Sequence, residues 1–171
     1  MFNKRYWRVQ SEVSECGLAC LSICSSILGA ELDMSTLRRK YHNSQRGVDL
    51  NQLIALASAL DMQCRPIRCE PEDLQGLSLP AILHWRLNHF VVLERVRRGR
   101  FHIIDPAHGS MTMSRAELAD AFTGVAVEVN TTPSFRPRKQ RSPLNIWSML
   151  RFRDGIGAAL FHVLVYSFLL Q

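Results

Sequence analysis

Cys16 stands where a polar stretch gives way to the apolar pattern of an amphipathic helix, in the segment Gln10-Ser-Glu-Val-Ser-Glu-Cys16-Gly17. A thiol in the first turn of a helix feels the positive end of the helix dipole, which favours the nucleophilic thiolate. Gln10 lies six residues upstream and offers an uncharged amide donor for an oxyanion. The segment therefore predicts a reactive thiol with a hydrogen-bond donor beside it.

A catalytic thiol also needs an imidazole within reach, held in place by a carboxylate or an amide. The sequence predicts two strands, 90–96 and 100–105, joined by a short loop at 97–99. In such a hairpin the start of the first strand lies beside the end of the second, so His89 and Asp105 are expected at the same end. This placement distinguishes His89 from the other five histidines. The alternatives are a packed or capping histidine, and an Asx-type turn before Pro106 for Asp105.

The elements that must position these residues follow from periodicity and capping signals. Apolar spacing predicts a helix over 14–28, and Asp33 and Asp49 are N-cap residues for two more, the second completed by Gln52 as a capping box. A capping box of Ser114 and Glu117 opens a later helix that extends to about residue 122. The expected strands are 63–69, 81–83, 90–96, 100–105, 110–113 and 125–129. Three helices followed by an antiparallel sheet predict an α+β domain.

Composition narrows the class of protein. The chain has 171 residues, enough for one domain with a core and an appendage. The net charge is +6, and the stretch 136–153 holds six Lys or Arg and no acid, so the rest is near neutral. This distribution argues against a nucleic-acid-binding domain. Five cysteines and no signal peptide at the start indicate reduced thiols in a protein that faces the cytosol.

The C-terminal part has a different character from the rest. We expect one folded domain over 1–130, a basic linker over 131–143, and an amphipathic segment with a truncated first transmembrane helix over 144–171. The uncharged run 155–170 is shorter than the roughly 20 residues of a full membrane span. The basic stretch before it would keep the N-terminal side in the cytoplasm. The alternative is a buried hydrophobic C-terminal helix.

Several short motifs recur in the order known from one family. The chain resembles the C39 peptidase domain found at the N-terminus of bacteriocin-processing ABC transporters, especially the colicin V secretion type. The resemblance covers nearly all of residues 8–130. The matching pieces are Gln10–Cys20, Leu37–Lys40, Arg46-Gly47, Ile82–Trp85, Asn88–Leu93, Asp105-Pro106-Ala107 with Gly109, and Phe122–Ala126.

This resemblance implies a papain-like cysteine peptidase that cuts leader peptides after a double glycine. By position, Cys16 is the nucleophile, His89 the general base and acid, Asp105 the group that orients the imidazole, and Gln10 the oxyanion donor. Because the nucleophile is present, an active peptidase is expected rather than a silent docking module, which is the alternative. Trp85 is a candidate for the groove that receives the leader, or else a core aromatic.

The resemblance also implies partners and a location. The partners are the double-glycine leader of a secreted bacteriocin or microcin precursor and the transmembrane and ATPase domains of a transporter, possibly assembled as a homodimer. The location is the bacterial inner membrane, with the peptidase facing the cytoplasm. No nucleotide-binding G-x4-G-K-[S/T] motif occurs, so ATP is expected only in a separate ATPase domain. No cofactor or metal is expected in this chain, and a calcium requirement stays open.

A third reading is a membrane-tethered redox or metal protein built on the five cysteines. Cys20 and Cys24 follow Cys16 at intervals of four, which places the three thiols along one helix face. No Cys-x-x-Cys pair occurs, and no histidine or acid has ligand spacing beside them. Plain packing of Cys20 and Cys24 is the simpler expectation.

Overall fold

The computed structural model describes residues 15–41, 48–137, 162 and 165–169. The chain divides into two compact units, Met1–Gln140 and Arg141–Gln171. The described residues of the second unit are helical. Within the part of the chain that the structure describes, none of the helices combines the length and apolar character that a membrane crossing requires. Most of the uncharged run 155–170 lies outside the described residues.

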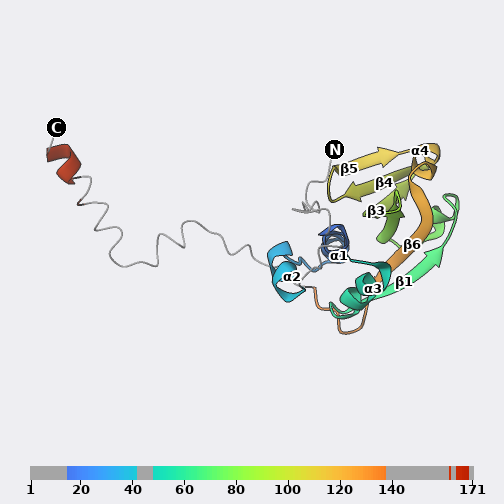
Figure 1. The fold of residues 1–171 in the computed structure, drawn as a ribbon, viewed down its shortest axis with the longest axis horizontal. Coiled ribbons are helices and arrows are strands. Elements are labelled where there is room, and N and C mark those ends of the chain that lie inside the picture. Colours follow the sequence, from blue (N-terminus) through green and yellow to red (C-terminus); the bar gives the residue numbers. More distant parts are fainter. Residues whose placement is uncertain (1–14, 42–47, 138–161, 163–164, 170–171) are drawn as a thin grey trace. The chain divides into compact units, whose positions relative to one another are not determined.

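The first unit opens with three helices, as the sequence predicts (Figure 1). They are α1 (Cys16–Ile27), α2 (Met34–Lys40) and α3 (Leu50–Ser58). The capping box of α3 is present: the Gln52 N–H donates to Asp49 Oδ1 at 2.8 Å, and the Asp49 N–H donates to Gln52 Oε1 at 3.1 Å. These two bonds satisfy backbone donors that a helix start otherwise leaves without partners.

From residue 62 on, the described part of this unit forms one antiparallel sheet of six strands with two short helices, which confirms the α+β class. The strands are β1 (Met62–Arg68), β2 (Ala81–Trp85), β3 (His89–Arg97), β4 (Arg100–Asp105), β5 (Gly109–Met113) and β6 (Phe122–Thr131). In space they follow the order β1-β6-β2-β3-β4-β5. A short 3-10 helix η2 (Asp73–Gly76) follows β1, and α4 (Arg115–Ala119) precedes β6.

One predicted boundary is wrong. The helix opened by Ser114 ends at Ala119 instead of reaching Phe122, which already belongs to β6. Phe122 is buried and pairs with Trp85 of β2, so packing and pairing place it in the sheet. Gly124 follows the expected end of this helix closely. It lies inside β6 with a φ of +83°, a conformation that glycine adopts without steric cost.

The end of β6 extends the packed unit beyond residue 130, where the sequence predicts the linker to begin. The Thr132 N–H donates to the Asp61 carbonyl oxygen at 3.1 Å. Phe135 packs against the core between the helices and the sheet. The chain that follows β6 is therefore held against the domain by the packing of Phe135.

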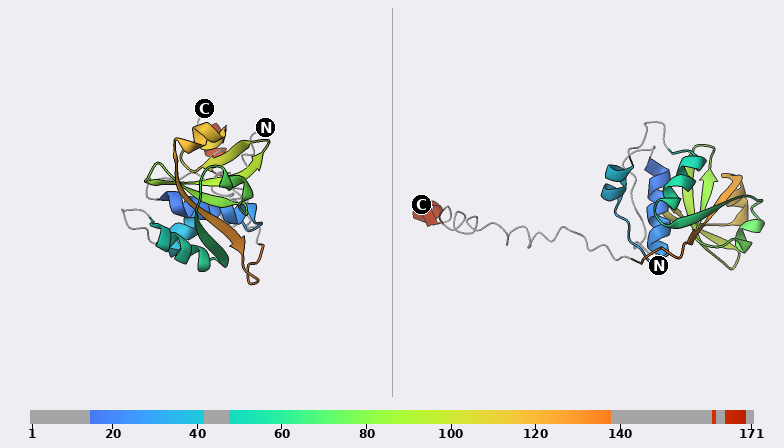
Figure 2. Two further views of the ribbon diagram at one scale, coloured as in Figure 1. Left: turned by 90° about the vertical axis from the view of Figure 1, so that its right-hand side faces the viewer. Right: turned by 90° about the horizontal axis from the view of Figure 1, so that it is seen from below.

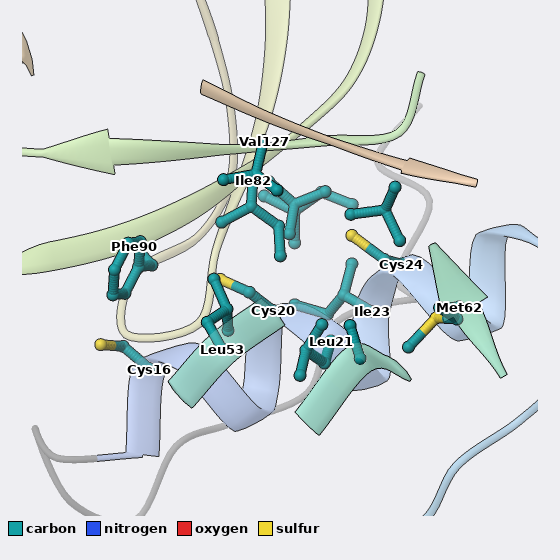
Figure 3. Close-up of a cluster of buried hydrophobic side chains, with 14 residues drawn as sticks. Cys16, Cys20, Leu21, Ile23, Cys24, Leu53, Met62, Ile82, Phe90 and Val127 are labelled. Carbon is teal, nitrogen blue, oxygen red and sulfur yellow. The ribbon is translucent and has the colours of Figure 1, made fainter. Parts of the chain in front are cut away.

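The sheet carries a core on each face, because successive side chains along a strand point to opposite sides. On one face, α1 and α3 cover a cluster that includes Phe90 and Val92 of β3 (Figures 2 and 3). On the other face, η2 and α4 cover a cluster that includes Val91 and Leu93. The strand that begins with His89 is thus fixed from both sides.

Leu53 is a sensitive point of the first core. Its side chain is fully buried in the cluster between α3, α1 and the sheet. We expect Leu53→Ala to lower the free energy of unfolding by about 2–5 kcal/mol, because it removes buried methyl groups and leaves a cavity. Urea denaturation followed by circular dichroism measures this change. The exposed neighbour Asn51 provides the control, since Asn51→Ala is expected to change stability by less than about 0.5 kcal/mol.

Candidate active site

Cys16 is the first residue of α1, as its sequence pattern predicts. Its side chain is buried at the end of the core cluster, close to Phe90 (Figure 3). The adjacent Gly17 lets this turn approach α3 closely. A Cβ on Gly17 would lie 3.3 Å from both Leu53 Cδ1 and Val48 Cβ. The position of the thiol is therefore set by tight packing between two helices.

A half-buried ion pair ties the start of α1 to α2. Glu15 is only 7% exposed, and its carboxylate accepts two bonds from the Arg38 guanidinium, at 2.6 Å from Nε and 2.8 Å from the terminal nitrogen. Such paired bonds fix both distance and orientation. They also place the positive charge of Arg38 against the Glu15 carboxylate, directly before Cys16 in the sequence.

His89 and Asp105 lie together at one end of the β3–β4 hairpin, which confirms the placement inferred from the sequence. His89 begins β3, Asp105 ends β4, and Nε2 of the imidazole lies 2.8 Å from Oδ1 of the carboxylate. Asp105 is 3% exposed. The alternative of an Asx-type turn is realised at the same time, because Oδ1 also accepts the Ala107 N–H at 2.8 Å.

These contacts shift the pKa values of both groups. Burial by itself raises the pKa of Asp105, but the bonds from His89, His108 and the Ala107 N–H outweigh it and lower the pKa to about 2. Asp105 is therefore ionised and acts as acceptor, so Nε2 of His89 is the donor. The bond to Asp105, and then a side-chain hydrogen bond to Cys16, raise the pKa of His89 to about 9.

The imidazole thus contacts both of its predicted partners. Since Nε2 is engaged by Asp105, Nδ1 is the ring nitrogen that remains for the thiol of Cys16. A thiol, an imidazole and a buried carboxylate joined in this order form the arrangement that activates a cysteine nucleophile for acyl transfer.

The other predicted residues are placed differently. Gln10 lies outside the described residues. Cys20 and Cys24 point from α1 toward the sheet (Figure 3), and burial raises the pKa of both thiols, so they are neutral core residues. Across the described residues, no three His, Cys, Asp or Glu side chains are grouped as a metal site.

A cavity of about 680 Å³ opens beside His89 and Asp105. Trp85 is buried and lines it, so this residue is both a core aromatic and part of the cavity wall. The cavity has an apolar part next to a charged part. The apolar lining is Trp85, Met111, Met113 and Ala121, and the charged lining is Arg86, Glu117 and Asp120.

Sequence reasoning missed one residue of the site. His108 Nδ1 lies 2.8 Å from Oδ2 of Asp105, the oxygen that does not bond His89. The only sequence signal is its place three residues after Asp105, in the turn between two predicted strands. Any turn residue has this spacing, so it did not single out His108.

A comparison with sequence models of known families agrees with the order of the motifs and with the geometry of the site. A sequence model of the peptidase C39 family matches residues 4–134. The chain belongs to the peptidase C39 family. This match covers the three helices, all six strands and the Cys16, His89 and Asp105 positions.

Curated relatives of this C39 chain include two secretion proteins of Escherichia coli. A probable microcin-H47 secretion/processing ATP-binding protein and the colicin V secretion/processing ATP-binding protein are each 36% identical to it over 162 residues. Each alignment covers 95% of this chain and 23% of the relative. The chain therefore spans about a quarter of the length of these relatives.

Solved structures show the same fold. The C39 chain is similar to a double glycine motif protease from an AMS/PCAT transporter, solved in complex with the leader peptide. The TM-score is 0.68 and the identity 28%, with 74% of this chain and 91% of that one covered. The peptidase domain of Streptococcus ComA has a TM-score of 0.66 at 22% identity, covering 73% of this chain and 97% of that one.

Proposed function

We propose that this C39 domain is a cysteine endopeptidase that removes double-glycine leader peptides from bacteriocin or microcin precursors, coupled to their export by an ABC transporter. The observation that carries the proposal is the position of His89, which is hydrogen-bonded to Asp105 through Nε2 and lies close enough to Cys16 for that thiol to help raise the pKa of the imidazole. The names of the E. coli relatives and the leader complex of the similar protease support the substrate class.

The proposed reaction has two stages. The Cys16 thiolate attacks the carbonyl carbon of the second glycine, and the amide bond breaks as the His89 imidazolium gives its proton to the leaving amine. A thioester to Cys16 remains. His89, now neutral, takes a proton from water, whose oxygen attacks the thioester and releases the leader carboxylate and the thiol.

Oxyanion stabilisation is assigned to two donors. The Cys16 backbone N–H, at the start of α1, and the Gln10 side-chain amide are proposed to hold the negative oxygen of each tetrahedral intermediate. Removing one such donor typically costs about 100- to 1,000-fold in kcat. All the groups in this scheme belong to side chains or backbone of the chain, so we propose a reaction without a bound cofactor or metal.

The cavity next to His89 is the proposed docking place for the leader. Its apolar lining, with Trp85 and Met111, suits apolar side chains of a leader helix, and the charged lining offers partners for polar residues. Binding energy from such remote contacts can be used to place the reacting bond. Glycine at the cut site fits a narrow approach to Cys16, which is itself almost fully buried.

The larger assembly is inferred from the relatives. We propose that the domain works with the transmembrane and ATPase domains of a transporter in the bacterial inner membrane, and that it faces the cytoplasm where precursors are made. ATP would act in the ATPase domain. A homodimer is the proposed assembly.

A leader peptide with a changed cut site tests the proposal. We expect cleavage directly after Gly-Gly, located by mass spectrometry, and complete inhibition by prior treatment with iodoacetamide. Replacing the second glycine of the peptide by valine is expected to lower kcat/KM by about 10- to 100-fold, because overpacking a tight site costs about 1–3 kcal/mol. Binding of the intact leader with no cleavage would instead identify a docking module.

A further inference from the structure

We propose that His108 is a positioning residue of the peptidase, which holds the Asp105 carboxylate in the orientation that supports His89. This inference rests on the proposed function for the identity of the substrate. The position of His108 is given separately by its contact with Asp105. His108 would act through Asp105 and would not touch the reacting atoms.

The two oxygens of Asp105 have separate roles. Oδ1 accepts from His89 Nε2 and from the Ala107 N–H, each at 2.8 Å. Oδ2 accepts from His108 Nδ1, also at 2.8 Å. Because the terminal torsion of an aspartate side chain is soft, one bonded oxygen does not by itself fix the carboxylate plane. The bond to His108 supplies the second fixed point.

The backbone holds His108 in this place. It lies in the turn between β4 and β5, whose closing residues Asp105 and Gly109 are paired in the sheet. Gly109 has a φ of +92°, which lets the chain turn back directly after His108. The exposed imidazole of His108 therefore reaches the Asp105 oxygen that His89 does not contact.

His108 also lines the cavity proposed to receive the leader. Its side chain is 75% exposed, whereas that of Asp105 is 4% exposed. Water can therefore compete for the Nδ1–H donor in the free enzyme. A leader that fills the cavity would cover this bond and exclude that water, and hydrogen bonds strengthen when water is removed. The contribution of His108 is then expected in kcat, after the leader has docked, more than in KM.

Three substitutions distinguish the effect of the hydrogen bond from His108 to Asp105 from the effect of the volume of the imidazole ring. His108→Ala removes both, His108→Phe keeps an aromatic ring without a donor, and His108→Asn places an amide donor near the position of Nδ1. We expect Ala and Phe to lower kcat about 5- to 10-fold with KM changed less than twofold, which is the scale of one hydrogen bond whose donor is exposed to water. Asn is expected to restore kcat to within about twofold of the unmodified enzyme.

His102→Ala is the matched control, since it removes another imidazole from β4, where the ring contacts Thr112 and not Asp105. It is expected to leave kcat unchanged. The proposal is overturned if His108→Ala leaves kcat unchanged, if Ala, Phe and Asn all lower it equally, or if only KM rises. Equal loss would indicate a role in folding, and a KM effect would indicate a leader contact.

A second measurement tests the role of His108 without a leader peptide. The rate at which iodoacetamide alkylates Cys16 near neutral pH reports the thiolate supported by His89 and Asp105, and needs no peptide. We expect His108→Ala and His108→Phe to slow alkylation, by less than they lower kcat because no leader covers the bond, and His108→Asn to restore the rate. If the domain cleaves no double-glycine peptide, the proposed function fails, whereas the alkylation rates still decide the role of His108.

Discussion

Replacing Cys16 by alanine is expected to lower kcat/KM for leader cleavage by at least about 10,000-fold, the scale seen when a catalytic nucleophile is removed. Among the described residues, Cys16 is the one cysteine that acts on the pKa of His89. The proposed oxyanion donors and the proposed docking cavity are unchanged in the variant, so we expect leader binding to persist. Chromatography measures the loss of cleavage, and fluorescence anisotropy measures whether the leader still binds.

Cys69 provides the matched control for the thiol. It is half-buried near the other face of the sheet, and burial raises its pKa, so it is a neutral side chain away from His89. Cys69→Ala is expected to retain activity within about twofold, as for other substitutions away from the reacting groups. Equal cleavage by the unmodified enzyme and Cys16→Ala would refute the assigned nucleophile.

Replacing Asp105 by asparagine is expected to lower kcat/KM about 1,000-fold or more, because an uncharged amide neither stabilises the imidazolium nor selects the correct tautomer of His89. The pH profile should change too. The pKa of His89 is raised to about 9, and the bond to Asp105 is the largest cause. The imidazolium is therefore present below about pH 9 and is lost as the pH rises through that value.

We expect the alkaline limb of the kcat/KM profile to lie near pH 9 in the unmodified enzyme and to move toward lower pH in Asp105→Asn. Profiles from pH 6 to 10.5 measure both midpoints. An alkaline limb at the same pH in both enzymes would show that Asp105 does not support His89.

The central pair of the site was predictable because it depends on a local hairpin. His89 and Asp105 flank two strands joined by a short loop, and antiparallel pairing alone brings their ends together. The capping boxes at Asp49 and Ser114 were predictable for the same reason, since each depends on residues three apart. The association of Cys16 with this pair came from the family resemblance and not from any local rule.

Other features depend on contacts distant in sequence. The end of α4 was misplaced because Phe122 follows a helical pattern, while its burial and pairing with Trp85 decide its conformation. His108 was missed because a turn position does not reveal which carboxylate oxygen it meets. The Glu15–Arg38 pair joins residues 23 positions apart, and nothing in either segment indicates it.

The strand order has a consequence for when the domain can fold during synthesis. β6 is the last strand in the sequence, yet it lies between β1 and β2 in the sheet. During synthesis the sheet therefore stays in two separate parts until the chain has passed Thr131. His89 and Asp105 are 16 residues apart and close a short loop, whereas Cys16 comes from α1, far earlier in the sequence. The complete sheet that carries the proposed peptidase site therefore forms late, and we expect a chain that ends before β6 to cleave no leader peptide.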